Sequence, residues 1–440
     1  MAYNNLNEVF GNEGISRMHV KSIDIQNYHG ISKLHVDFHE GINLLIGNNG
    51  AGKTSLLNAI AVILQESFLR LSGVGFTNLY ASDAYQTTTI MGDAIVNTER
   101  HYPIRIDSVV SWENKNYPRS IVKSNESAII ERKELEIVKL FEKRIGDKSA
   151  TMPILCFLPA QRGKLKEVKT NTIQIANGEP QRSQGYRNAF SGAQDISEIQ
   201  QWCVQMDFAE YQKKKKIHEY NEFQAIISRF CSIMDDKAVN PKVYYSSEKS
   251  SLVYFDGADE KALYQLSDGF QAALCMIMEL AYRAILLNPA MENTAEYVEG
   301  IVLIDEIEMH LHPAWQWIIL GAFQQVFPKV QFIIATHSPI ILSSANKATL
   351  LLMKSPNEVM ELDSAYGYSI DDVLSLPQGT LSQPKKVKEY YDQIERILES
   401  GTEEELNHLL EKAKEEFKDS PVVLKRIVDF AEVNRWVEDA

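Results

Sequence analysis

The octet GNNGAGKT, at residues 47–54, follows the short apolar run INLLI and precedes a stretch typical of a helix. The run, Ile42–Ile46, predicts a buried strand, and the helix is expected from Lys53 onward. The octet fits the pattern G-x-x-x-x-G-K-[ST], in which glycines let backbone N–H groups converge on phosphate oxygens at a helix N-terminus. A strand, a glycine-rich turn and a helix in this order indicate an α/β protein with a nucleotide phosphate on the turn.

Within this turn, two side chains have expected roles in binding ATP and Mg²⁺. Lys53 would reach the β- and γ-phosphates, and the Thr54 hydroxyl would bind Mg²⁺, a small hard cation that favours oxygen ligands. The full nucleotide-binding set is expected to be Asn48, Asn49, Gly50, Ala51, Gly52, Lys53, Thr54 and Ser55.

Two further buried strands end in polar side chains that suit phosphate chemistry. GIVLIDE ends in Asp305, which suits a water-mediated Mg²⁺ contact, and Glu306, which could polarise the attacking water as a general base. VQFIIATHS presents His337, whose neutral imidazole could contact the γ-phosphate or that water. We therefore expect Lys53, Glu306 and His337 to be the catalytic residues. The simpler alternatives are two acids that end a strand at the surface and a structural histidine.

The turn EMHLHP contains His310 and His312 close to Glu308. This trio could suggest a metal site, but H-x-H on a tight turn also suits a contact between subunits, and no further ligand cluster supports zinc. The four cysteines lie far apart without C-x-x-C spacing, which argues against zinc and against a disulfide framework.

A second anion-binding helix start is expected at LSDGFQ, ahead of a long apolar helix. One nucleotide needs only one phosphate-binding loop, so this second element is expected to serve the nucleotide of another copy of the chain. Its residues are Leu266, Ser267, Asp268, Gly269, Phe270 and Gln271.

The ordered set GNNGAGKT, LSDGFQ, LIDE and ATHS resembles the ATP-binding cassette (ABC) ATPases, particularly the branch with chromosome-maintenance proteins and OLD-like defence ATPases. The resemblance covers residues 19–360 and implies that two heads enclose two ATP molecules, with Ser267 and Gly269 acting in trans. It also implies a glutamine lid. Gln86 in AYQTTTIMGD is the candidate, also as a Mg²⁺ ligand, and Gln161 is the weaker alternative. The sequence departs from the family at Asn27-Tyr28-His29, where an arginine near the adenine is typical.

The segments IDEIEMHLHPAWQ, FPKVQFIIATHSPIIL and YGYSIDDVL resemble the PtuA family, the ATPases of Septu anti-phage systems. This resemblance implies an HNH endonuclease partner, PtuB, and a homo-dimer or an oligomer of dimers. DNA contact is then expected through the complex. The chain itself contains no HNH, DEDD or TOPRIM-like block, so nuclease activity is expected only in the partner.

The fold class expected is α/β: an ABC-ATPase head, with a mixed sheet around the phosphate loop and an antiparallel β subdomain, a helical insertion and a C-terminal helical tail. Four domains are expected: the first half of the head at 1–125, the insertion at 126–239, the second half of the head at 240–365, and a helical tail at 366–440. The tail is expected to mediate oligomer formation or to bind a partner protein. Within the insertion, the polar stretch 163–192 is expected to be a mobile loop.

Basic residues suggest two places for nucleic acid. The first is the polar loop, which is net basic and is the preferred candidate for DNA or a partner, through Arg162, Lys164, Lys166, Lys169, Arg182 and Arg187. The second is the run Lys213–Lys216. Here the favoured interpretation is a set of solvent-exposed charges without a nucleic-acid contact, because consecutive residues on a helix spread around its circumference.

The net charge of −14 over 440 residues means that any nucleic-acid contact must be confined to one face. No window approaches the roughly 18 uninterrupted apolar residues of a membrane span, so we expect a cytoplasmic protein without a membrane contact. The favoured function is an ATPase whose nucleotide state controls an associated effector. The alternatives are a DNA repair or recombination ATPase and a scaffold that holds ATP without turnover.

Overall fold

The computed structural model describes residues 17–75, 78–91, 95–133, 136–161, 181–191, 196–246, 248–249, 251–368, 370, 373, 385–418 and 421–438. The chain divides into two compact units, Met1–Gly367 and Tyr368–Ala440. Each unit is described by itself.

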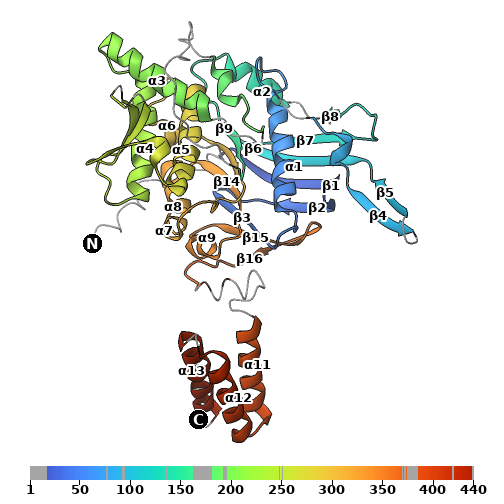
Figure 1. The fold of residues 1–440 in the computed structure, drawn as a ribbon. Coiled ribbons are helices and arrows are strands. Elements are labelled where there is room, and N and C mark those ends of the chain that lie inside the picture. Colours follow the sequence, from blue (N-terminus) through green and yellow to red (C-terminus); the bar gives the residue numbers. More distant parts are fainter. Residues whose placement is uncertain are drawn as a thin grey trace. The chain divides into compact units, whose positions relative to one another are not determined.

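A six-stranded mixed sheet forms the centre of the first unit (Figure 1). Its strands, in spatial order, are β16 (Glu358–Leu362), β15 (Thr349–Ser355), β3 (Ile42–Ile46), β14 (Val330–Ala335), β13 (Gly300–Ile304) and β9 (Ile154–Leu158). All neighbours are parallel except the edge pair β15 and β16. Every residue of β3, β13 and β14 is buried, as expected for a parallel sheet covered on both faces. The carboxyl ends of β3, β14, β13 and β9 therefore lie at one edge of the sheet.

A second, antiparallel sheet lies beside it, and buried residues alternate with accessible ones along its first strands. Its strands, in spatial order, are β2 (Ile31–Asp37), β1 (His19–Tyr28), β6 (Ile104–Trp112), β7 (Lys115–Lys123) and β8 (Glu131–Lys133). Helix α1 (Lys53–Gln65) contacts strands of both sheets. A separate two-stranded hairpin consists of β4 (Gln86–Met91) and β5 (Ile95–Arg100).

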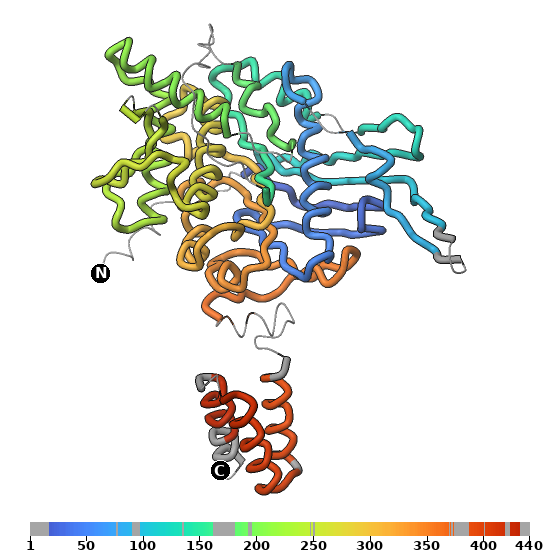
Figure 2. Tube along the Cα trace, viewed as in Figure 1, coloured from blue at the N-terminus to red at the C-terminus, as the bar shows by residue number. Residues whose placement is uncertain are grey.

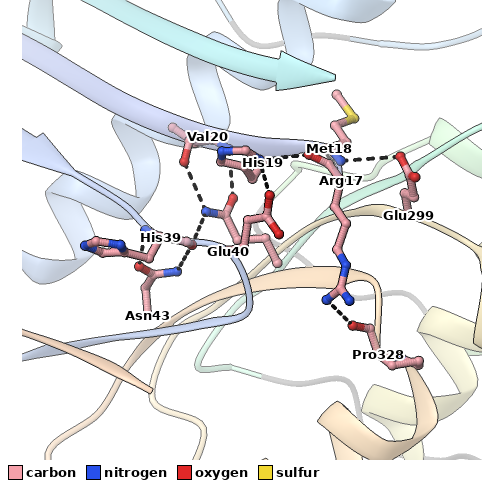
Figure 3. A network of polar contacts seen from close by, with 10 residues as sticks. Arg17, Met18, His19, Val20, His39, Glu40, Asn43, Glu299 and Pro328 are labelled. Carbon is pink, nitrogen blue, oxygen red and sulfur yellow. Dashed lines mark hydrogen bonds and ion pairs between the residues drawn. The ribbon is translucent and has the colours of Figure 1, made fainter. Parts of the chain in front are cut away.

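Side-chain amides join the two sheets (Figure 3). The buried Gln331 on β14 accepts from the N–H of Val20 on β1 at 2.8 Å and donates to the Val20 carbonyl at 3.1 Å. Gln331 also donates to the carbonyl of His39 at 2.8 Å, and buried Asn43 on β3 donates to the same carbonyl at 2.8 Å. Because buried amides must be paired, these bonds hold β1 and the segment before β3 against the central sheet.

The remaining helices of the first unit include short 3₁₀ turns. They are η1 (Glu66–Phe68), η2 (Ala81–Asp83), α2 (Glu136–Ile145), η4 (Arg182–Tyr186), α3 (Ile196–Lys213), α4 (His218–Met234), η5 (Leu263–Gln265), α5 (Asp268–Leu287), α6 (Thr294–Tyr297), α7 (Pro313–Gln316), α8 (Ile319–Val326) and α9 (Pro339–Ser344). A third sheet consists of β10 (Lys242–Ser246), β11 (Ser251–Phe255) and β12 (Glu260–Ala262). Helices α3 and α4 pack on α5. Helix α5 is long and apolar enough to span a membrane by composition, but 89% of its apolar window is buried inside the protein.

The segment that contains η4 is packed into the first unit. The Tyr186 side chain is completely buried and stacks on Phe68 at 4.3 Å between ring centroids. The Arg182 guanidinium donates to backbone carbonyls, at 2.7 Å to Leu287 and 2.6 Å to Asp147. The predicted mobile loop at 163–192 is therefore wrong for residues 181–191, because one tyrosine and one arginine anchor them; residues 162–180 lie outside the described part of the chain.

Over residues 385–418 and 421–438, the second unit forms helices α11 (Lys385–Ser400), α12 (Glu403–Glu416) and α13 (Pro421–Glu438), drawn in red in Figure 2. Their shared apolar core includes Ile394, Leu406, Ala413 and Ile427. Thr402 and Glu405 form a capping box that begins α12. The mixed sheet, the antiparallel sheet and the surrounding helices confirm the predicted α/β fold class. The predicted bounds of the helical insertion, 126–239, are wrong at the N-terminal side, because β8 belongs to the antiparallel sheet and β9 to the central sheet, and pairing between distant strands leaves no local signal.

Candidate nucleotide-binding site

The turn between β3 and α1 depends on glycine. Gly47, Gly50 and Gly52 have φ angles of 143°, 80° and 98°, in the region that side chains disfavour. A Cβ atom on Gly47 would also lie 2.3 Å from the carbonyl oxygen of Met353. The glycines of the predicted phosphate-binding loop are therefore required by its backbone path.

The start of α1 fits an anionic ligand. Its N-cap, Gly52, offers no side-chain hydrogen bond, and the first turn of the helix itself contains no acidic residue, so the N–H groups of this turn are not capped from within the helix. The buried Lys53 ammonium donates to the carbonyls of Gly47 at 2.7 Å and Asn48 at 3.1 Å. Burial lowers the pKa of Lys53, while neighbouring carboxylates act in the opposite direction. A phosphate group would supply the negative partner that this ammonium lacks inside the loop.

Thr54 connects the loop to the end of β13. Its hydroxyl donates to Oδ2 of the buried Asp305 at 3.0 Å. Because the hydroxyl hydrogen points to Asp305, the oxygen lone pairs of Thr54 are available to a cation. Within the described ranges, no group of three or more His, Cys, Asp or Glu side chains could hold a metal ion. The donor set thus fits Mg²⁺ held by a hydroxyl, a carboxylate, phosphate oxygens and water, which is the coordination Mg²⁺ prefers.

Glu306, directly after Asp305, has an unusual backbone. Its φ is 47°, in the left-handed region, and its side chain is half-buried. A non-glycine residue in this conformation costs free energy and is found most often at functional sites. The strain directs a carboxylate to the same sheet edge as the phosphate-binding loop, which is where a general base would be needed.

Glu308 holds the end of the neighbouring strand β14, a role that the sequence interpretation missed. One carboxylate oxygen accepts from the Thr336 hydroxyl at 2.7 Å, and the other accepts from the N–H of His337 at 2.6 Å. Burial, followed by the positive charge of Lys53, lowers the pKa of His337. Both effects favour the neutral form of the imidazole. In the sequence, Glu308 stands out only as a possible metal ligand beside His310 and His312, and that pattern does not indicate its contacts with β14.

The adjacent histidines have other surroundings. His310 is exposed with a φ of 66°, and the His312 ring nitrogen accepts from the N–H of Ala314 at 3.3 Å as the N-cap of α7. The local arrangement of His312 is therefore that of a helix cap.

Ser267 begins α5, the predicted second anion-binding helix. Its hydroxyl accepts from the N–H of Phe270 at 3.4 Å, and both Ser267 and Asp268 are exposed. Gly269 is buried, and a Cβ atom there would lie 2.5 Å from the carbonyl oxygen of His310. The helix start therefore packs closely on the turn that follows Glu306.

Two further members of LSDGFQ, Phe270 and Gln271, have packing roles. The Phe270 ring contacts the rings of Tyr254 and Trp315 at 4.7 and 5.3 Å between centroids. The Gln271 side chain donates to the carbonyl of Leu266 at 2.7 Å. These contacts fix the segment ahead of α5 and leave Ser267 on the surface.

The two glutamine candidates lie in different elements. Gln86 is exposed and begins β4 of the hairpin, outside the central sheet. Gln161 is exposed and comes three residues after Leu158, the last residue of β9. Strand β9 is parallel to β13 in the central sheet, so Gln161 follows the same edge that presents Asp305. The topology thus favours Gln161 over Gln86 as the lid glutamine, because the hairpin position gives Gln86 no link to that edge.

The basic residues of the predicted polar loop are only partly described. Arg182 is buried among carbonyls, and Arg187 pairs with Glu198 at 3.4 Å. Both guanidinium groups therefore already have partners within the protein. The other four predicted cations, Arg162, Lys164, Lys166 and Lys169, lie outside the described residues.

Comparison with known proteins places this site in a family. A family model described as "AAA domain, putative AbiEii toxin, Type IV TA system" matches residues 42–343, from β3 to α9. The chain is 23% identical to the Retron Vc95 probable ATPase of Vibrio cholerae serotype O1 biovar El Tor, across 88% of this chain and 85% of that protein. It is 24% identical to the Septu protein PtuA of Bacillus thuringiensis, across 74% of this chain and 73% of that protein.

A solved SMC head domain from Thermotoga maritima aligns with 78% of this chain and 99% of its own, at a TM-score of 0.44 and 11% identity. The predicted resemblance to Septu ATPases is confirmed by the sequence relatives. Since the family model extends over more than half of the chain, this protein belongs to the AAA-domain family described as putative AbiEii toxin, Type IV TA system.

Proposed function

We propose that this chain binds and hydrolyses ATP with Mg²⁺ as the ATPase subunit of a cytoplasmic anti-phage defence complex. Two copies would enclose two nucleotides, each between the phosphate-binding loop of one copy and Ser267 of the other. The nucleotide state would then control an associated HNH nuclease. The names of the relatives, a retron probable ATPase and Septu protein PtuA, support this class of system.

One observation carries the proposal. The hydrogen bond from Thr54 to Asp305 joins the loop helix to the end of β13, and the strained Glu306 follows directly. This arrangement unites a phosphate-binding loop, a cation-binding oxygen pair and a candidate base at one sheet edge. Such a set is what transfer of a phosphoryl group to water requires.

The residues of this chain divide the work of hydrolysis. Lys53 would turn from the loop carbonyls to the phosphate oxygens and stabilise their charge. Glu306 would accept a proton from the attacking water while the water oxygen bonds to the γ-phosphorus. At the same time, the bond between the γ-phosphorus and the bridging oxygen of the departing ADP breaks. His337, neutral and held by Glu308, would donate to the γ-phosphate. Mg²⁺, when bound near Thr54 and Asp305, would neutralise charge on the β- and γ-phosphates.

Phosphate release tests the catalytic assignment. Glu306→Gln is expected to lower release by roughly a hundredfold or more with ATP still bound, since general-base catalysis contributes about 10²–10⁴-fold. Glu292→Gln, at an exposed position, is the control for loss of one carboxylate. Equal and negligible release by the wild type and both variants would support a scaffold that holds ATP without turnover.

Mixing two inactive variants tests the reciprocal site. A dimer of one Lys53→Ala chain and one Ser267→Arg chain has one doubly damaged site and one intact site if the two residues act across the dimer. Random mixing is then expected to recover up to about a quarter of the wild-type rate, because half of the dimers hold one intact site of two. No recovery, with both variants dimeric, would mean that Ser267 serves its own chain.

The nuclease assignment has a simple test. The purified chain is expected to leave DNA uncut in the presence of ATP and Mg²⁺, and cutting is expected only after an HNH partner is added. Cleavage by the chain alone would contradict this part of the proposal.

A further inference from the structure

The four lysines at 213–216 lie at the corner between α3 and α4 and do not surround a helix. Lys213 is the last residue of α3, and Lys214 has a φ of 49°, in the left-handed region. Helix α4 begins at His218, so the run ends one helix and forms the turn to the next. All four lysines are exposed. The expectation that a helix disperses these charges therefore does not apply.

Two acidic side chains in the last turns of α3 are already occupied, and Glu219 in the first turn of α4 is a third acid close to the run in sequence. Glu210 accepts from the Lys216 ammonium at 2.7 Å, and its side chain is only 10% exposed. Asp207 accepts from the Tyr220 hydroxyl at 2.8 Å, and burial raises the pKa of Asp207 to about 6. Among the described residues, no ion pair neutralises Lys213–Lys215. Three ammonium groups thus remain available to an anionic partner.

Two large aromatic side chains stand beside these lysines. Tyr211 is 82% exposed and Phe208 is 48% exposed. Residues three apart on a helix share a face, so both rings belong to the same side of α3. Attraction of lysine to a helix C-terminus explains Lys213, but it explains neither Lys215 in the turn nor the exposed rings.

We propose that this lysine corner, formed by Phe208, Tyr211 and Lys213–Lys215, binds single-stranded nucleic acid. The ammonium groups contact phosphates, and the aromatic rings stack on unpaired bases. The net charge of −14 repels phosphodiesters from most of the protein, so a local basic site is required for such binding. A duplex keeps its bases stacked inside and cannot use the rings. This inference goes beyond the proposed function, and it does not depend on ATP hydrolysis.

Fluorescence anisotropy of the full chain tests the proposal, with a labelled oligothymidylate of about 20 nucleotides, longer than common single-strand site sizes. A duplex of the same length and phosphatidylserine vesicles are the competing probes. The oligothymidylate is expected to bind more tightly than the duplex. Tyr211→Ala is expected to weaken its binding about tenfold through lost stacking. The triple variant K213Q/K214Q/K215Q is expected to reduce the slope of log K against log salt by about 2.

The control is K33Q/K139Q/K261Q, which changes the net charge equally at exposed positions elsewhere. It is expected to leave the slope nearly unchanged. Equal losses in the two triple variants would overturn the proposal, as would equal affinity for duplex and single strand together with no effect of Tyr211→Ala. Vesicle binding that competes with the oligonucleotide and survives Tyr211→Ala would assign the corner to membranes and also overturn it. Unchanged phosphate release by the corner variants separates this test from the test of the proposed function.

Discussion

Replacing Glu308 or Glu306 by glutamine removes one of two carboxylates that lie two positions apart, and the two variants are expected to differ in their effects on stability and turnover. Glu308 accepts hydrogen bonds from Thr336 and from the N–H of His337, at 2.7 and 2.6 Å. Glutamine retains one acceptor oxygen and presents an NH₂ group to the other donor. Because Thr336 is completely buried, the lost bond cannot be replaced by bulk water.

The size of the effect follows from these two bonds. A hydrogen bond to a charged group contributes about 1.5–3 kcal/mol, so Glu308→Gln is expected to lower the free energy of unfolding by about 2–3 kcal/mol. The unfolding entropy of a unit as large as Met1–Gly367 is on the order of 0.75 kcal/mol/K. The Tm of Glu308→Gln is therefore expected to be about 3–4 °C below that of the wild type. Glu306→Gln leaves both bonds of Glu308 to the end of β14 in place, and its Tm is expected to fall by less than that of Glu308→Gln.

The assay is thermal unfolding of the nucleotide-free protein in EDTA, followed by intrinsic tryptophan fluorescence, with phosphate release measured in parallel. Glu306→Gln is expected to lose turnover with the smaller fall in Tm. Glu308→Gln is expected to show the larger fall in Tm and to lose part of the turnover, since His337 is then poorly held. An unchanged Tm for Glu308→Gln, or a larger fall for Glu306→Gln, would refute the division into a catalytic and a positioning carboxylate.

Three further predictions concern other parts of the chain. Gly269→Ala places a methyl group 2.5 Å from the His310 carbonyl and is expected to reduce both Tm and phosphate release. Gly321→Ala, on helix α8 where a Cβ atom has room, is expected to raise stability by roughly 0.5–1 kcal/mol. Equal thermal shifts of the two variants would contradict this reasoning. Because the pKa of His337 is lowered in the folded protein, the unfolded chain takes up the proton of this imidazole at a higher pH than the folded chain does. The free energy of unfolding is therefore expected to fall as the pH drops below 6.5, and urea titrations at several pH values should show a weaker decline in His337→Asn. Ile394→Ala is expected to destabilise the second unit by about 2–4 kcal/mol without changing ATP affinity of the first, which calorimetry and nucleotide titration can check; weaker ATP binding would indicate that the two units are energetically coupled.

Much of the central sheet was predictable because local patterns specify it. The runs before Gly47, Glu306 and His337 are mainly apolar, with Asn43 and Gln331 as polar exceptions, and the structure contains them as the buried strands β3, β13 and β14. Parallel strands bring their carboxyl ends to one edge, so the convergence of these three polar segments followed from the class of fold.

Segments held by a few long-range contacts were not predictable. Residues 181–191 have the composition of a loop, and contacts with distant segments hold them in place. Among these are the buried ring of Tyr186, the carbonyl contacts of Arg182 and the bond from Arg283 to the carbonyl of Gly185. The positions of Gln86 and Gln161 depend on which strands pair, and pairing partners far apart in the chain leave no local signal.

The sequence by itself determined the phosphate-binding turn, the polar ends of the buried strands and the order of the motifs, because each depends on residues within about one turn or strand of each other. Tertiary structure alone decided that Glu308 secures the end of β14, that Gly269 must lack a side chain beside His310, and that the lysine run forms an exposed corner. Those features are set by groups that meet only after the chain has folded, and hydrogen-bond geometry and close packing between distant segments specify them.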